Sequence, residues 1–405
     1  MLVAVIGGGA AGMAAAYAAA SAGAEVVIFE RNEKLGKKLF ISGKGRCNLT
    51  NDSDIEQHLS AVMRNSRFLY SAYHALSPSD LMRLIESCGV TLKTERGGRV
   101  FPASDKSSDI LRAWQSLLTS SRVKIHLDER VHSISRTEDG FAIDTSVGKY
   151  ISDKVIVCTG GMTYQATGST GDGYKFASKL GHTITDLFPS LVGIKAKIPN
   201  FLPGLSLKNV EITVSSQGKT VCKEFGEMLF THTGISGPIV LRASARINRM
   251  DMKDIKISLD LKSALTEETL DARLLREFGA GINKTVHKVL PSLMPKSLIP
   301  LVLSQAEIDP DTPCHSISKE ARKRLCRVVK AIEILPIGME DTNGAIVTSG
   351  GVSVTEVNAK DMQSKLVSGL YFAGEILDVD ALTGGYNLQI AFSTGYLAGS
   401  NAAKG

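Results

Sequence analysis

Short apolar runs, glycine turns and helical patterns follow one another at the start of this chain. Leu2 to Ile6 is an apolar run, Gly7 to Gly12 is rich in glycine, and an alanine-rich segment up to Ala20 predicts a helix. Glu25 to Phe29 predicts a second strand, which ends at Glu30. Strand, glycine turn, helix, strand and acid, in this order, are typical of a dinucleotide-binding βαβ unit.

Each position in this turn has a physical reason. Gly7 permits a tight turn, Gly9 lets the backbone approach a pyrophosphate, and Gly12 lets the helix pack closely on the strand. The helix N-terminus offers free N–H groups to the phosphates, and the carboxylate of Glu30 can accept the ribose hydroxyls. The alternative is a glycine turn in an ordinary βαβ unit, and an acid at this distance argues against it.

The middle of the first half predicts further elements of the same unit. A basic, glycine-rich stretch at 31–51 is expected to be a loop that wraps an anion, and Ser107 or Ser108 is expected to cap a helix beginning near Asp109. Alternating runs between 123 and 151 predict a small meander, and 155–161 predicts a buried strand that ends in glycines.

The pattern changes at about residue 191. Strand-like runs at 191–197, 208–214, 219–225 and 255–261 precede helical runs at about 266–278, 283–290, 297–306 and 318–331. These predict an inserted domain with a small β-barrel or sheet and a helical cap. The fold class is therefore α/β, a discontinuous Rossmann-like dinucleotide-binding domain with a β-barrel and helical insertion. Its expected boundaries are 1–190, 191–335 and 336–405.

Composition adds limits on compartment and partners. The chain has 405 residues and a net charge of +6, which is compatible with anionic ligands and demands none. The spacing of the six cysteines suits neither a zinc site nor a disulfide framework, so we expect reduced thiols, no metal and a cytoplasmic protein. No apolar stretch of about twenty residues predicts a membrane span.

The C-terminal segment indicates which dinucleotide is bound. A buried strand ending at Phe372 to Glu375 is followed by a helix that begins at about Asn387. That strand end can reach a ribityl chain, and the helix N-terminus can point at the flavin edge where negative charge gathers on reduction. The cofactor predicted from these elements is FAD.

Several segments resemble one family along nearly the whole chain. The sequence resembles the bacterial NAD(P)/FAD-dependent oxidoreductases known as aminoacetone-oxidase-like or BaiN-like flavoproteins. The matching segments are Gly7–Gly12, Ser42–Asn51, Gly98–Pro102, Thr167–Tyr174, Leu229–Pro238 and Phe372–Gln389. The resemblance implies a discontinuous FAD domain with an inserted barrel and helical region. Gln165 and Ile390 depart from the family pattern, so the substrate does not carry over.

Resemblance and position together predict the residues that contact the cofactor. Val131 is expected to contact the adenine, Thr159 and Gly160 to pass near the pyrophosphate, and Arg46, Cys47 and Asn48 to lie close to the isoalloxazine. The complete predicted set is Gly7, Gly9, Ala10, Ala11, Gly12, Glu30, Arg31, Lys38, Arg46, Cys47, Asn48, Val131, Thr159, Gly160, Gly374, Glu375, Asn387 and Leu388.

The sequence predicts an enzyme but does not reveal its substrate. We expect an FAD-dependent oxidoreductase that transfers hydride between flavin and a small organic substrate, with oxygen or transient NAD(P)H completing the cycle. The catalytic residues stay unassigned: His232 and Asn48 are the candidates, and His232 could equally be structural. The alternative is an RNA-associated or tRNA-modifying flavoprotein, suggested by the basic run from Lys319 to Lys330. Such a run is more typical of a solvated helix face, so the expected partner is a small-molecule substrate and not a nucleic acid.

Overall fold

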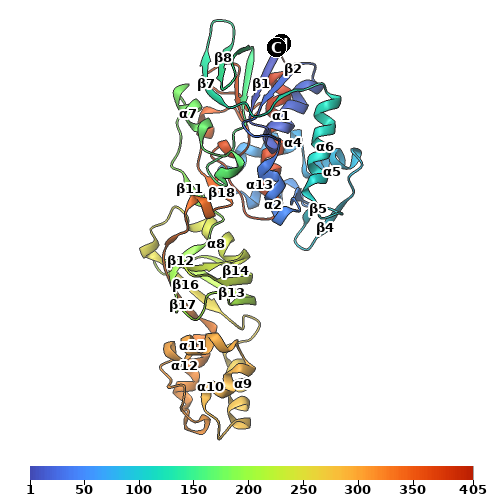
Figure 1. The fold of residues 1–405 in the computed structure, drawn as a ribbon. Coiled ribbons are helices and arrows are strands. Elements are labelled where there is room, and N and C mark those ends of the chain that lie inside the picture. Colours follow the sequence, from blue (N-terminus) through green and yellow to red (C-terminus); the bar gives the residue numbers. More distant parts are fainter. Residues whose placement is uncertain (405) are drawn as a thin grey trace. The chain divides into compact units, whose positions relative to one another are not determined.

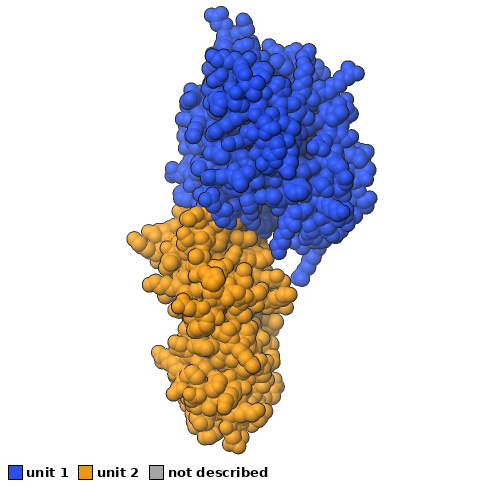
Figure 2. Space-filling view, viewed as in Figure 1, with its two compact units in different colours: residues 1–190, 342–405 blue, residues 191–341 orange. Residues whose placement is uncertain are grey.

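The structure is a computed structural model that describes residues 1–404, and it divides the chain into two units (Figure 2). One unit comprises Met1–Ser190 and Thr342–Gly405, and the other comprises Leu191–Asp341. The expected boundary at 336 is too early, because strand β17 (Ile332–Met339) still pairs with β12 (Ile194–Lys197) and β16 (Ile255–Asp260). The chain therefore leaves the first unit once and returns to it once.

A five-stranded parallel sheet organises the first unit. Its strand order is β19-β10-β1-β2-β6, and every neighbouring pair is parallel. The order reverses at β1, where the chain first crosses to β2 and β6 and later returns to β10 and β19, as in doubly wound nucleotide-binding folds. The predicted Rossmann-like α/β fold is confirmed. Crevices at such a reversal are where these sheets bind ligands.

The first unit also contains smaller antiparallel sheets, including the meander β7-β8-β9 that projects from it (Figure 1). Its helices and strands are β1 Leu2–Ile6, α1 Ala10–Ser21, β2 Glu25–Phe29, α2 Lys37–Gly45, β3 Thr50–Asn51, α3 Ile55–Ala61, α4 Tyr70–Ala75, α5 Pro78–Ser87, β4 Leu92–Glu95, β5 Arg99–Pro102, α6 Ser107–Ser120, β6 Lys124–His126, β7 Val131–Arg136, β8 Phe141–Thr145, β9 Lys149–Ser152, β10 Lys154–Val157, α7 Asp172–Lys179, β11 Phe188–Ser190, β18 Val347–Ser349, β19 Leu370–Phe372 and α13 Tyr386–Ala402.

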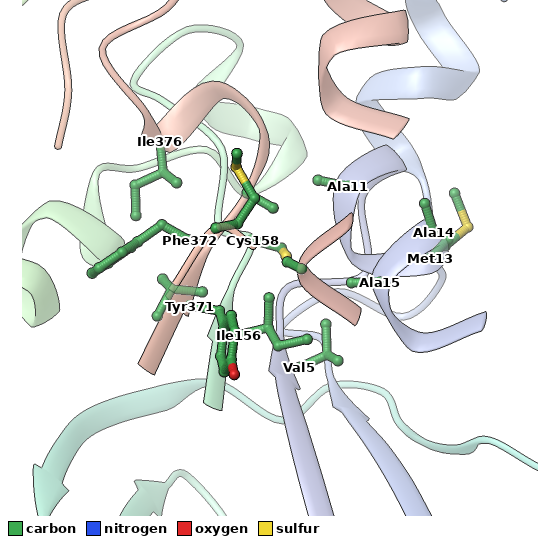
Figure 3. Packing of buried hydrophobic residues seen from close by; sticks show 14 of the residues in the cluster. Val5, Ala11, Met13, Ala14, Ala15, Ile156, Cys158, Tyr371, Phe372 and Ile376 are labelled. Atoms are coloured by element: carbon green, nitrogen blue, oxygen red, sulfur yellow. The ribbon is translucent and has the colours of Figure 1, made fainter. Parts of the chain in front are cut away.

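Helix α1 lies in the centre of the first unit. Its alanines are buried on nearly all sides, and side chains from β1, β10 and β19 complete the core beside it (Figure 3). Helix α13 packs against α1 so closely that a Cβ added at Gly395 would lie 2.2 Å from the carbonyl oxygen of Ala11. A Cβ added at Gly399 would lie 2.0 Å from that of Ala15. Small residues on both helices therefore bring the N-terminal and C-terminal halves of the unit together.

A closed six-stranded barrel forms the second unit, with α9, α10, α11 and α12 gathered at one end of it (Figure 1). The strand order is β12-β15-β14-β13-β16-β17, and β17 pairs with β12 to close the ring. The predicted barrel and helices are confirmed. The elements not yet bounded are β13 Ser206–Ser216, β14 Lys219–Phe230, β15 Gly234–Ser236, α8 Pro238–Ile247, α9 Glu267–Ala280, α10 Val286–Val289, α11 Ile299–Gln305 and α12 Lys319–Lys330.

Three local predictions are wrong. Part of the expected loop at 31–51 forms α2, which leaves helical geometry at Ser42. The run near 123–127 joins the parallel sheet as β6 instead of the meander, because it pairs with β2. The serine cap is absent: Lys106 is the N-cap of α6, and the hydroxyl of Ser107 donates to the carbonyl of Phe40. In the last two cases a contact distant in sequence overrides the local pattern.

In the second unit, the sequence did not anticipate α8, β15 and β17. Each is adjacent to barrel strands and completes the second unit. Among residues 1–404, no helix combines the length and apolar character needed to cross a bilayer.

Two buried histidines give the stability of the first unit a pH dependence. His58 Nε2 lies 3.0 Å from the carbonyl oxygen of Asn51, and His182 Nε2 lies 2.8 Å from the hydroxyl of Ser364. Burial lowers the pKa of both imidazoles below its ordinary value. The unfolded chain therefore binds protons more readily, so this contribution to stability is present above about pH 6.5 and is lost as the pH falls.

We therefore expect the thermal midpoint to decline below about pH 6.5, and to decline less steeply in the double variant H58Q/H182Q. The measurement is a series of thermal melts, each variant compared with its own midpoint at neutral pH. Exposed His132 provides the control H132Q, which should keep the wild-type slope. Parallel pH profiles for wild type and the double variant would contradict the assignment.

Candidate dinucleotide site

The turn between β1 and α1 has the geometry that its glycines predict. Gly7 has φ +101°, and a Cβ there would lie 2.6 Å from the carbonyl oxygen of Cys158. A Cβ on Gly12 would lie 1.9 Å from the carbonyl oxygen of Gly7, so only glycine lets the helix approach the strand. A Cβ on Gly9 would meet no heavy atom within 4 Å. The turn is thus tightly packed beneath Gly7 and Gly12 and open above Gly9.

The carboxylate of Glu30 is buried at the end of β2. One oxygen accepts the N–H of Gly8 at 2.7 Å, and the other accepts the main-chain N–H of Asn32 at 2.9 Å and its side-chain amide at 2.6 Å. An ionised carboxylate has about four acceptor sites, so these three bonds leave capacity for a ribose hydroxyl. Glu30 therefore orders the turn and still faces the cavity.

The N-terminus of α13 forms the opposite side of the site. The side chain of Asn387 accepts the N–H of Ala381 at 2.9 Å and donates to its carbonyl at 2.7 Å, which holds the preceding loop against the helix. The first helical N–H groups have no partner within the helix, because their carbonyl acceptors would precede it. Free N–H groups and the positive end of the helix dipole thus point out of α13, as the sequence predicts.

These elements surround a cavity within the first unit, with an open volume of about 1380 Å³. Its lining joins the β1–α1 turn, the end of β2, the loop after β10, the segment after β19 and the start of α13. The predicted residues that line it are Gly7, Gly9, Ala10, Ala11, Glu30, Arg31, Lys38, Val131, Thr159, Gly160, Glu375, Asn387 and Leu388.

The remaining predicted residues do not line this cavity. Gly12 and Gly374 support it from behind, since a Cβ on Gly374 would lie 2.8 Å from the Cβ of Ala11. Arg46 stacks on Phe101 with its guanidinium carbon 4.0 Å from the ring centre. Cys47 is buried with φ +60°. The expectation that Arg46 and Cys47 lie close to the isoalloxazine stays a prediction.

Asn48 has a structural role next to the site. With its amide oriented to satisfy both partners, it accepts the N–H of Gly385 at 3.0 Å and donates to the carbonyl of Thr50 at 3.1 Å. Gly385 is the N-cap of α13. Asn48 therefore positions the start of α13, and a catalytic role for it stays a prediction.

Two charged networks border the cavity. The ammonium of Lys38 lies 2.6 Å from Glu375 and donates to the hydroxyl of Thr163 at 2.8 Å. Arg31 and Arg130 both pair with Asp172, at 3.4 Å and 2.7 Å. These pairs fix cationic groups at the rim, where an anionic ligand would enter.

Several lining residues were not predicted from the sequence. They include Phe29, Asn32, Glu129, Arg130, Asp172, Ile346 and Val347. Asn32 and Arg130 had a local signal, because each lies within two residues of a predicted contact. No local signal in the sequence indicated Ile346 and Val347, because only the return of the chain from the second unit brings them to the cavity.

Cys47 is unsuited to thiolate chemistry. Burial raises the pKa of its thiol to about 12, which keeps the thiol protonated near neutral pH. It forms no disulfide. The geometry therefore favours the packing role over a redox role.

His232 belongs to the other unit. It is exposed in the turn between β14 and β15 and lines a separate hollow there, together with Lys197, Phe230 and Arg327. A catalytic role for His232 stays a prediction. Within residues 1–404, no group of three or more His, Cys, Asp or Glu side chains is arranged to hold a metal ion.

The donor set of the cavity fits FAD. The hydroxyl of Thr159 is buried at the cavity wall and has no hydrogen-bond partner among residues 1–404, so a bound polar group can satisfy it. The space above Gly9 lies at the N-terminus of α1, where a pyrophosphate would be favoured. Glu30 offers acceptor capacity for a ribose, and α13 offers N–H groups on the far side. All of these groups belong to one unit.

Comparison with known proteins identifies the family to which the chain belongs. Residues 1–401 match the family described as the HI0933-like protein Rossmann domain. The chain belongs to this family. It is 33% identical to a 3-dehydro-bile acid delta(4,6)-reductase of Clostridium scindens, with 99% of each chain covered. It is also 30% identical to a ribosomal RNA dihydrouridine synthase of Haemophilus influenzae, over 97% of this chain and 96% of that one.

A third relative, a ribosomal RNA dihydrouridine synthase of Escherichia coli, is 29% identical over 97% of this chain and 95% of that one. Among solved structures, a 3-ketosteroid delta1-dehydrogenase of Sterolibacterium denitrificans shares the fold, with a TM-score of 0.53, 14% identity and 99% of each chain covered. The resemblance inferred from the sequence is confirmed, and so is the assignment to the FAD-dependent oxidoreductases.

Proposed function

We propose that this protein is an FAD-dependent reductase that saturates a carbon–carbon double bond conjugated with a carbonyl group. The main support for the proposal is that the names of the relatives imply compounds with the same kind of reducible double bond. A 3-dehydro-delta(4,6) compound and a uridine ring both contain a double bond conjugated with a carbonyl, and both relatives are named for reduction or for the reduced product. Each matches this chain almost end to end, so the shared reaction is a stronger inference than either substrate.

The residues of the first unit have distinct roles in this proposal. Bound FAD supplies the hydride chemistry, while the protein supplies binding and orientation. The α1 N-terminus and Gly9 hold the pyrophosphate, and Glu30 accepts from the adenosine ribose. The N–H groups at the start of α13 stabilise negative charge at the flavin edge, which favours reduction. Asn48 and Asn387 hold that helix end in place.

We propose NAD(P)H as the electron donor. The sequence contains one dinucleotide fingerprint, at Gly7–Gly12, and FAD occupies it in this scheme. The nicotinamide cofactor would therefore bind transiently, without a Rossmann domain of its own. We also propose a cytoplasmic location, where NAD(P)H is present and where the six free cysteines would stay reduced.

Uridine within ribosomal RNA is the acceptor that the charge distribution favours. Leu191–Asp341 contains 22 lysine and arginine residues against 17 acidic residues, a net charge of +5. The whole chain has a net charge of +6, so the other unit is nearly neutral. A small dienone requires no such cationic region, whereas a polyanion does. The alternative predicted from the basic run is thus preferred to a small organic substrate.

An anaerobic half-reaction series tests the proposal. The purified holoprotein should bleach on addition of NADPH or NADH, and protein-free bacterial ribosomal RNA lacking dihydrouridine should restore the flavin absorbance. The RNA should then contain dihydrouridine by mass spectrometry. Reoxidation by a 3-oxo-4,6-dienone steroid alone would support the reaction and reject RNA as substrate. A flavin that neither acceptor reoxidises would reject the reaction.

A further inference from the structure

The exposed face of α12 has a regular cationic pattern. Lys319, Lys323 and Arg327 occur at every fourth residue and are exposed. Successive members are therefore about 6 Å apart along the helix axis, and the three span about 12 Å. We call these three residues the α12 stripe.

Carboxylates act on the α12 stripe only at longer range than an ion pair, Glu320 on Lys319 and Lys323, and Asp271 on Lys323. None of the three side chains of the stripe forms a hydrogen bond or ion pair with the described residues 1–404. The other cations of α12 differ in this respect. Arg322 pairs with Asp271 at 2.7 Å, and Lys330 pairs with Asp260 at 2.6 Å.

The opposite face of α12 anchors the helix to the second unit. Leu325, Cys326 and Val329 are buried in the core of the second unit. Ser318 caps the helix by accepting the N–H of Ala321 at 3.1 Å. The stripe is therefore carried by a helix anchored along its length, which lowers the entropic cost of binding a ligand there.

The end of the α12 stripe borders the hollow of the second unit. Arg327 lines the hollow of the second unit, and exposed Lys197 lines the same hollow. Glu307 and Glu333 are the acidic residues of that lining. The α12 stripe thus reaches the rim of a concave region whose lining has two cationic and two acidic residues.

We propose that the α12 stripe is a docking surface for the sugar–phosphate backbone of RNA, with the three side chains on successive phosphates. The inference rests on the proposed function, because it takes RNA as the partner. Lysine and arginine aligned on one helix face form the electrostatic footprint expected of a nucleic-acid contact. A contact of this kind gives affinity without sequence specificity, and the reacting uridine must be selected elsewhere.

Salt-dependent binding of protein-free ribosomal RNA tests the proposal. Wild-type holoprotein, K319Q/K323Q and the triple variant with R327Q are titrated at several salt concentrations. Each phosphate contact contributes about 0.7 to 0.9 to the slope of log K against log salt. The magnitude of the slope should therefore fall by about 1.4 to 1.8 in the double variant and by about 2.1 to 2.7 in the triple variant.

A matched control lies in the first unit. Lys175 and Lys179 are also exposed and four residues apart on one helix, α7. K175Q/K179Q removes the same charge and should keep the wild-type slope. An equal loss in this control, an unchanged slope in the α12 variants, or wild-type protein that binds no RNA at low salt would each overturn the docking surface.

A second readout separates this proposal from the proposed reaction. Bleaching of the flavin by NAD(P)H should be the same in wild type and in the α12 variants, because the stripe lies outside the dinucleotide site. RNA binding with the predicted slopes but without dihydrouridine would retain the docking surface and reject the reaction. Reduction of the RNA with equal efficiency by the triple variant would retain the reaction and reject the docking surface.

Discussion

The variant G9V should fold normally and bind FAD far more weakly than the wild type. Gly9 has φ −79° and ψ −168°, which is extended backbone that valine adopts readily. Its Cβ position meets no heavy atom within 4 Å, so the fold has room for the side chain. That room is the space above the N-terminus of α1 where the pyrophosphate is expected. We expect affinity for FAD to fall by about 100-fold or more, equivalent to roughly 3 kcal/mol.

FAD titration of the apoprotein measures the affinity, and thermal melts of the apo form measure whether the variant folds normally. Gly148 provides the control, because its Cβ position is also open and it lies outside the cavity. G148V should bind FAD like the wild type, and both variants should unfold near the wild-type apo midpoint. If G9V were purified with its flavin and titrated normally, the site would not be the one described.

The variants G395A and G399A should destabilise the first unit. A methyl group at either position would lie about 2 Å from a carbonyl oxygen of α1, at Ala11 or Ala15. These obstacles are backbone atoms in a buried helix, so neither can rotate away. Overpacking in a core costs about 1–3 kcal/mol per site, and we expect values at the upper end here. Because α13 also forms one side of the cavity, flavin content should fall with stability.

The control for this pair is G279A. Gly279 lies within α9, and no heavy atom lies within 4 Å of its Cβ position. Alanine there should stabilise the protein by about 0.5–1 kcal/mol through its better helix propensity. Thermal midpoints and flavin content are measured for all three variants. If G395A and G399A were each as stable as the wild type, α1 and α13 could separate without cost.

The confirmed predictions share one property, a signal contained within a short segment. The glycine turn, the helix after it and Glu30 lie within the first thirty residues, and local spacing determines their geometry. Strand-like alternation likewise indicated much of the barrel. A motif of this kind predicts well because a few neighbouring residues specify both the turn and the ligand-binding groups.

The failed predictions share another property, a partner distant in sequence. The strand at 124–126 has an ambiguous local pattern, and only pairing with β2 places it in the parallel sheet. Ser107 is a good capping residue by type, yet its hydroxyl bonds to Phe40 instead.

The sequence by itself determined the family, the Rossmann fingerprint, the inserted barrel and 13 of the residues that line the cavity. Tertiary structure decided which groups meet there from separate segments: Lys38 with Glu375, Arg130 with Asp172, and Asn48 with the start of α13. It also decided that Lys319, Lys323 and Arg327 have no ion pair among residues 1–404, whereas Arg322 and Lys330 do. The reason is physical: local periodicity specifies an element, whereas partners and burial arise only when distant elements pack.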